Sequence, residues 1–153
     1  MRPSAFTGGR FLLSAYQLPV WVWPAALITV CGLAVWRGGN YERLGVAGVL
    51  LAWALSMVAF KARTEGTQWA ILAIDSSVFA VFMWIALRSG RYWPLFTAGF
   101  GLLSLATHFA SAVDPKVSGW AYWTAERIWS YLILLSLAYA AWTAPYARRA
   151  NIE

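Results

Sequence analysis

The strongest constraint on this chain is a series of five long apolar runs, each about as long as a helix that crosses a lipid bilayer. A membrane-spanning helix needs roughly 20 largely apolar residues, with a tolerance of about 17 to 25. The runs cover residues 20–36, 44–60, 69–87, 92–113 and 120–143. They predict an all-α, polytopic membrane protein in which residues 20–144 form a bundle of five transmembrane helices.

The composition excludes a water-soluble fold. Hydrophobic residues make up 61% of the chain, whereas soluble domains contain about 45–50%. Charged residues make up only 12%, about half of the usual share. A soluble globule of this size would lack the polar surface that it needs, so we expect almost no folded mass outside the bilayer.

Short polar connections separate the apolar runs. They lie at residues 37–40, 63–66, 88–91 and 114–116, and each contains a glycine or a proline, the residues that most often interrupt helices. Because the connections are so short, we expect consecutive helices to be antiparallel neighbours.

Residues 1–19 precede the first run and differ from it in character. Arg2 and Arg10 lie before a short apolar stretch, and Pro19 interrupts the chain ahead of the first span. A secretory signal would need an Ala-x-Ala-like cleavage site, and none follows at a suitable distance. We therefore expect an uncleaved interfacial segment at the N-terminus, and a short basic tail over residues 145–153.

The tryptophans gather at the ends of the predicted spans. Tryptophan prefers the two membrane interfaces, where its apolar ring can carry a polar N–H. At one predicted face lie Trp21, Trp23, Trp69, Trp120 and Trp123. At the opposite face lie Trp36, Trp93 and Trp142. The two groups match the interfaces that the apolar runs predict.

The formal net charge of +6 arises mainly from basic residues in the short connections, where they would meet lipid phosphates and set the topology. No basic stripe with interleaved aromatic residues lies outside the apolar runs, so we expect no binding of nucleic acid. The numbers of Lys and Arg at the two faces are nearly equal. Their tighter clustering beside the C-terminus favours a cytoplasmic C-terminus, and we expect the membrane to be a bacterial inner (plasma) membrane.

Familiar catalytic and cofactor motifs are missing from the sequence. Cys31 is the single cysteine, so an intrachain disulfide and a cysteine-based metal cluster are excluded, and it fits a small buried apolar residue. There is no glycine-rich phosphate loop, no GxSxG nucleophile motif and no kinase or zincin signature. The sequence predicts no cofactor.

Ionisable residues inside membrane spans are costly and therefore need an explanation. Four of them lie inside the predicted spans: Asp75, His108, Glu126 and Arg127. Their depth can be compared by counting residues from the nearer end of each span, with a rise of about 1.5 Å per residue. By this count, all four lie about two helical turns below the membrane face at which the N-terminus lies. Three consecutive helices could therefore bring two carboxylates, an imidazole and a guanidinium together.

Hydroxyl and small residues extend this polar level along the helices. On the fourth run they recur at helical spacing, as Thr97, Gly101, Ser104, His108 and Ser111. On the fifth run, Glu126 and Ser130 are four residues apart and share a face. The spacing predicts a polar seam that points into the bundle.

Three roles are consistent with this cluster. Buried ion pairs and hydroxyls could fix helix packing and do nothing more. An aspartate and a histidine at membrane depth could instead form a proton relay or an ion site. One histidine and two carboxylates could also hold a divalent cation, but their spacing matches no recognised metal motif, and a single histidine excludes bis-His haem ligation. The sequence therefore predicts no metal site.

The second run offers a smooth face of small residues. Gly48, Ala52 and Ser56 repeat every four residues, a pattern that lets another helix approach closely. Such a stripe serves packing within one chain more often than docking of a partner.

These observations lead to one expected function and two alternatives. The minimal mass outside the membrane and the missing motifs favour an accessory or structural subunit of a membrane complex, which contacts lipid, other subunits or a second copy of itself. The first alternative is a small proton- or ion-coupled transporter or channel that uses Asp75 and His108, with Glu126 and Arg127 as gating residues. The second is a membrane enzyme that acts on a lipid or a quinone.

Overall fold

The computed structural model describes residues 21–59, 69–114 and 118–150, of which 93% are helical. Five helices follow one another along the described chain. They are α2 (Val22–Arg37), α3 (Asn40–Ala59), α4 (Trp69–Ser89), α5 (Trp93–Val113) and α6 (Gly119–Ala150). The all-α bundle is therefore confirmed, whereas the expected interfacial segment at 1–19 and residues 151–153 of the basic tail lie outside the described residues.

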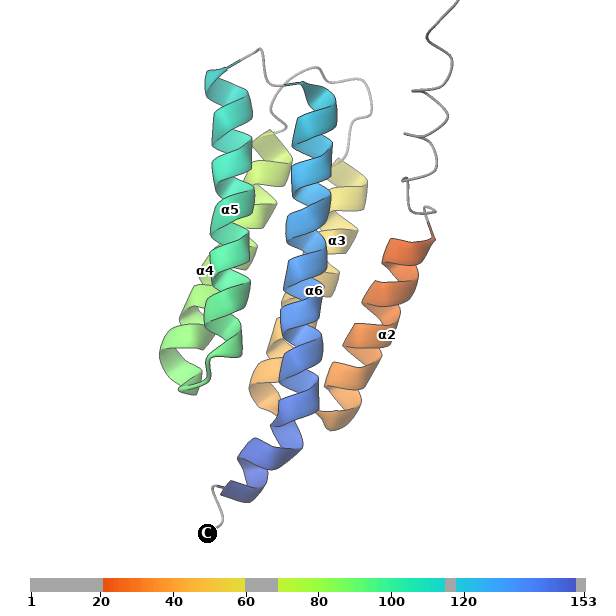
Figure 1. Cartoon of the computed structure of the whole chain (residues 1–153), viewed down its shortest axis with the longest axis vertical. Helices are drawn as coiled ribbons and strands as arrows, with labels where there is room; N and C mark the ends of the chain where they lie inside the picture. Colours follow the sequence, from red (N-terminus) through yellow and green to blue (C-terminus); the bar gives the residue numbers. More distant parts are fainter. Residues whose placement is uncertain (1–20, 60–68, 115–117, 151–153) are drawn as a thin grey trace, which may run out of the picture.

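The five helices are arranged as a ring in which successive helices alternate in direction, so that α2 and α6 run parallel (Figure 1). Each helix packs on the next one in sequence, and α6 closes the ring by packing along α2. In addition, α3 and α6 touch across the middle of the ring, in the least extensive of the helix pairings. Short connections thus make sequence neighbours into antiparallel spatial neighbours, as helix-bundle geometry requires.

The first connection is shorter than the sequence indicates, because α3 begins at Asn40 and only Gly38 and Gly39 separate it from α2. Glu42, the third residue of α3, accepts a hydrogen bond from the backbone N–H of Gly39 at 2.7 Å. This is one half of a capping box, and it extends the helix toward its N-terminus. A Cβ on Gly38 would lie 2.2 Å from the carbonyl oxygen of Ala34, so only glycine fits this turn.

The last helix is longer than expected, since α6 continues past Thr143 to Ala150. Alanine and arginine are strong helix formers, which explains why these residues of the expected basic tail are helical. Figure 1 shows the last turns of α6 bending away from the bundle axis. Pro145 lies within the last two turns of α6, and a proline inside a helix removes a backbone hydrogen bond and favours a kink.

Three helices are long and apolar enough to span a membrane, namely α3, α4 and α5. The described part of α2 is a shorter apolar helix of 16 residues, about 24 Å long at 1.5 Å per residue. The 32 residues of α6 are long enough but more polar on average. The chain is therefore a helical bundle that is embedded in a membrane.

The hydrophobic core lies toward the end of the bundle that carries the α2–α3 and α4–α5 connections. Most of its members come from the second halves of α2, α4 and α6 and the first halves of α3 and α5, and include Cys31, Val46, Phe82, Trp93, Ala98 and Leu137. Gly90 makes the tight α4–α5 turn possible, because its φ of 59° is unfavourable for other residues. The opposite end of the bundle contributes few residues to this core, and Asp75, His108 and Glu126 lie toward that end.

Candidate functional site

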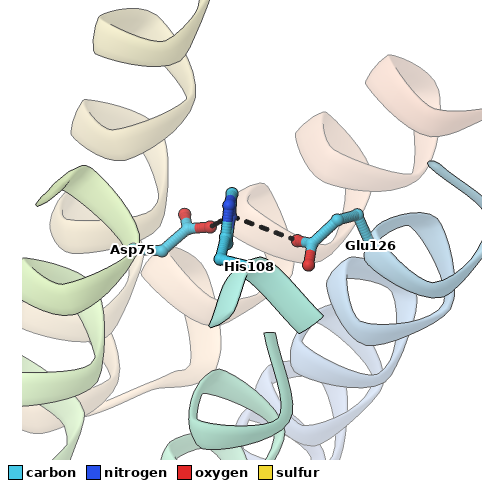
Figure 2. A group of neighbouring side chains, drawn as sticks. All are labelled: Asp75, His108 and Glu126. Carbon is cyan, nitrogen blue, oxygen red and sulfur yellow. Dashed lines mark hydrogen bonds and ion pairs between the residues drawn. The ribbon is translucent and has the colours of Figure 1, made fainter. Parts of the chain in front are cut away.

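Three helices each contribute one ionisable side chain to a compact cluster, formed by Asp75 of α4, His108 of α5 and Glu126 of α6. The three lie about two turns from the end of the bundle where α4 and α6 begin and α5 ends. Figure 2 shows the imidazole of His108 between the two carboxylates. The structure thus brings together three of the four ionisable residues that share a predicted depth.

Histidine 108 is the centre of this cluster and is fully buried. Its Nε2 lies 3.0 Å from Asp75 Oδ2 and 3.9 Å from Glu126 Oε2. On the other side of the ring, Nδ1 lies 3.0 Å from the hydroxyl oxygen of Tyr122, which is also buried. Contacts to both nitrogens fix the orientation of the imidazole, so that Nε2 points at the two carboxylates.

Ser104, one helical turn before His108, connects the two carboxylates. Its hydroxyl oxygen lies 2.7 Å from Glu126 Oε2 and 3.2 Å from Asp75 Oδ2. A serine hydroxyl has one proton, so it can donate fully to only one of them at a time. The two acidic groups therefore compete for the same donors, the Ser104 hydroxyl and the His108 ring.

Within the described chain, no lysine or arginine forms an ion pair with the two carboxylates of the cluster. Among the ion pairs of the described residues, Asp75 and Glu126 are paired only with the imidazole of His108. The second oxygen of Glu126, Oε1, is buried and has no hydrogen-bond partner within the described chain. Two carboxylates around one imidazole need a further positive charge, which a proton or a metal cation can supply.

A cavity of about 500 Å³ adjoins the cluster between α3, α4 and α6. Asp75 and Glu126 belong to its wall, and most of the remaining lining is apolar or aromatic. Trp23 and Trp53, whose ring centroids are 5.9 Å apart, lie on the side of α2 and α3. The exposed side chains Met57, Trp123 and Arg127 also line the cavity, so it opens to the surroundings of the protein.

The small residues predicted to form a packing or docking stripe face this part of the structure. A Cβ on Gly48 would lie 3.7 Å from Val81 of α4, which is an ordinary contact distance. Ala52 and Ser56 line the cavity. The stripe on α3 therefore points toward α4 and the cavity.

The remaining residues of the predicted polar level lie near the cluster but outside it. Arg127 is exposed and lines the cavity. The hydroxyl of Ser130 bonds to the backbone carbonyls of Glu126 and Arg127, and its side chain also lines the cavity. Ser111 is half-buried one turn beyond His108 and makes none of the hydrogen bonds described above.

Two residues that the structure places in polar networks are absent from the sequence prediction, Tyr122 and Glu42. Tyr122 lies four residues before Glu126, so helical spacing alone puts both on one face of α6. Glu42 is fully buried at the other end of the bundle, where it binds Arg91 and accepts a hydrogen bond from Trp93 Nε1 at 3.2 Å. Its position as the third residue of a helix that follows two glycines is the signal that could have revealed it.

Trp93 lies at the N-terminal end of α5, as the sequence places it, but its ring faces the interior of the bundle rather than lipid. It is 2% exposed and packs edge-on against Phe82, with the ring centroids 6.1 Å apart. Its N–H is satisfied by Glu42 rather than by lipid headgroups. By contrast, Trp36 and Trp142, expected at the same face, are exposed.

Comparison with protein-family models, curated proteins and solved structures gives no significant match for this chain. Any function therefore has to be inferred from the cluster and the cavity themselves.

Proposed function

We propose that this chain is a small cation-coupled membrane transporter in which Asp75, His108 and Glu126 form the cation site. The observation that carries the proposal is the meeting of these three side chains, from three different helices, beside an open cavity. A transporter needs a site inside the membrane that can hold a cation and a path that leads to it. The cluster supports the first requirement and the open cavity beside it supports the second.

The energetic cost of the cluster supports this proposal over a purely structural role. Burying two carboxylates at membrane depth is expensive, and helix packing can be achieved by neutral hydroxyl groups at much lower cost. Here the carboxylates share one serine hydroxyl and one imidazole, and the Oε1 atom of Glu126 has no partner among the described residues. Carboxylates that pair with no lysine or arginine of the described chain favour the entry of a cation.

The uneven packing of the bundle supports the same function. The core fills the end of the α2–α3 and α4–α5 connections, whereas the cavity separates α3 from α6 at the other end. Helices that are firmly packed at one end and separated at the other can move apart and together around an intervening site. Arg127, which lines the cavity, is positioned to repel or admit cations as a gating residue.

The proposal includes a topology that goes beyond the three apolar helices. In it, α2 and α6 also cross the bilayer, which gives five spans, in a bacterial inner membrane with the C-terminus in the cytoplasm. The ring arrangement supports five spans, because α2 and α6 pack along each other and along helices that are long and apolar enough to cross.

The test is cation flux into proteoliposomes that contain the purified full-length chain. Gradients of H⁺, Na⁺, K⁺ and Zn²⁺ are imposed one at a time, and uptake is followed with a fluorescent reporter enclosed in the vesicles. We expect at least one gradient to collapse faster than in empty vesicles, and Asp75→Asn to abolish that difference, because the variant removes one negative charge of the site.

Ser136→Ala is the matched control for this experiment. Ser136 is buried on α6, but its hydroxyl bonds only to the carbonyl of Leu132 in its own helix. It should leave the flux unchanged. A flux that is the same in Asp75→Asn and in the native chain, or no flux of any of the four cations, would contradict a transport function.

A second candidate is an accessory subunit of a larger membrane complex, and the exposed surface of α4 favours it. Within α4, which is described throughout, only Phe82 and Ile85 are buried. A large apolar face is thus available to lipid or to a partner helix. Native mass spectrometry of membranes dissolved in mild detergent should then find a constant partner, and a monodisperse monomer would count against this candidate.

A further inference from the structure

We propose that Asp75, His108 and Glu126 form a binding site for a divalent transition-metal ion of the Zn²⁺ type. The identification of this ion as the transported cation rests on the proposed function. Binding of the ion at these three residues does not depend on transport. Each of the three residues offers one ligand atom, and these atoms all lie within 4.8 Å of one another.

The distances match a tetrahedral ion closely. Bonds of about 2.0–2.1 Å, which are usual for zinc, place the ligand atoms of a tetrahedral site about 3.4 Å apart. In the structure, His108 Nε2 lies 3.0 Å from Asp75 Oδ2 and 3.9 Å from Glu126 Oε2. Both distances lie within about 0.5 Å of the tetrahedral spacing, and the ligand oxygens of Asp75 and Glu126 lie within 4.8 Å of each other. Rotation of the two carboxylate side chains toward each other would complete the coordination.

The hydrogen bond from Tyr122 prepares the histidine for a metal. A ligating histidine usually uses its other ring nitrogen to bond a fixed partner, which orients the ring and sets the tautomer. Tyr122 lies 3.0 Å from Nδ1, and a phenol can either donate or accept a hydrogen bond. When it accepts the proton of Nδ1, the lone pair of Nε2 points at the two carboxylates.

Glu126 provides a second and independent observation. Its Oε1 atom is buried without a hydrogen-bond partner in the described chain, although its Oε2 atom bonds to Ser104. A carboxylate with one unsatisfied oxygen can coordinate a cation through either oxygen, or through both. Ser104 then keeps one carboxylate in place as a hydrogen-bond donor behind the ligands.

The donor set selects the class of cation. An imidazole nitrogen with two carboxylates suits Zn²⁺ and its neighbours among the first-row transition metals. Ca²⁺ and Mg²⁺ prefer six or more oxygen ligands and keep their water, which three protein ligands including a nitrogen do not match.

The coordination is incomplete, and its open side faces the cavity. Three protein ligands leave a fourth tetrahedral position, which is typical of sites that exchange a ligand rather than of closed structural sites. Asp75 and Glu126 line the cavity, whereas His108 is fully buried behind them. A cation can thus enter and leave from the carboxylate side.

Zinc binding is measured on the full-length chain without an affinity tag, in mild detergent, by competition with a fluorescent zinc chelator. We expect His108→Ala and Asp75→Asn to lower the affinity for Zn²⁺ by more than about 100-fold, because each removes a ligand. Tyr122→Phe should lower it by about 10- to 100-fold, the usual effect of losing a residue that hydrogen-bonds to a metal ligand.

Asp114→Asn is the control for these variants. This exposed carboxylate lies at the same end of the bundle, and its replacement should leave the affinity for Zn²⁺ unchanged. Excess Mg²⁺ or Ca²⁺ should not displace Zn²⁺.

Absorption of bound Co²⁺ provides a readout on the native chain in case His108→Ala does not fold. Intense visible bands that Zn²⁺ displaces support a site with few ligands, and the weak spectrum of the hydrated ion overturns the inference. A native chain that does not compete with the chelator, or an affinity that His108→Ala and Asp75→Asn leave unchanged, also overturns it.

The two proposals can fail separately. Tight Zn²⁺ binding without flux of any tested cation contradicts transport and leaves the metal site standing. Flux of H⁺, Na⁺ or K⁺ that Asp75→Asn abolishes, in a chain that does not bind Zn²⁺, contradicts the metal site and leaves transport standing.

Discussion

Ser104 illustrates how much a single hydroxyl can determine in a membrane bundle. It lies within hydrogen-bonding distance of Asp75 and of Glu126, on helices that precede and follow its own. Interhelical hydrogen bonds in membranes contribute about 0.6 kcal/mol on average, with a maximum near 1.7. Because both carboxylates would lose a hydrogen-bond donor without Ser104, its contribution to the free energy of unfolding should lie in the upper part of this range.

Replacement of Ser104 by alanine should therefore lower the free energy of unfolding by about 1–2 kcal/mol. The measurement is the midpoint of unfolding in mixed micelles with increasing SDS, followed by circular dichroism. Ser136→Ala, which removes a hydroxyl that bonds only within its own helix, should cost less than half as much. An equal decrease in the free energy of unfolding of the two variants would mean that Ser104 does not stabilise the bundle through the two carboxylates.

The glycines in and just before α3 differ in how much space surrounds them. A Cβ on Gly45 would lie 3.1 Å from Phe82 and 3.2 Å from Trp93, so the core packs directly against the backbone there. A Cβ on Gly38 would collide with backbone in the α2–α3 turn. Gly48, by contrast, has room for a methyl group, although it belongs to the small-residue stripe that suggested close packing.

The two glycines Gly38 and Gly48 should thus respond to alanine in opposite ways. Gly38→Ala should destabilise the bundle by about 1–3 kcal/mol, because the methyl group can fit only if the turn moves. Gly48→Ala should be neutral or should stabilise by up to about 1 kcal/mol, because alanine favours a helix more than glycine does. The same SDS titration compares the free energies of unfolding of the two variants. A larger decrease in Gly48→Ala than in Gly38→Ala would mean that the small-residue stripe on α3 has no room for a methyl group.

The ring of helices as a whole has a closed and an open end. The core side chains and the Glu42 network hold one end together, and the cavity and the Asp75 cluster occupy the other. Because α5 is long and apolar enough to cross a bilayer, its two ends are expected on opposite sides of the membrane. Residues at the two ends of α5 should accordingly be reached from different compartments.

Single-cysteine labelling tests this arrangement in the native membrane. In a Cys31→Ala background, Ser89→Cys and Asp114→Cys place one thiol near each end of α5, which is long and apolar enough to span. A membrane-impermeant maleimide applied to intact cells should label only one of the two, and lysis should make the other accessible. Labelling of both in intact cells would contradict a membrane-spanning α5.

The sequence by itself determined the helices, their order and their antiparallel packing, because apolar runs of membrane length and short connections permit little else. It also placed Asp75, His108, Glu126 and Arg127 at one depth, since the rise per residue is constant along a helix. Only the tertiary structure decided which of them meet. Successive residues are rotated by about 100° around a helix axis, so Glu126 and Arg127 cannot both point at His108. The spacing of Glu126 and Ser130 indicated the polar face of α6, but only the packing of α6 against α5 turned Glu126 toward His108 and left Arg127 exposed.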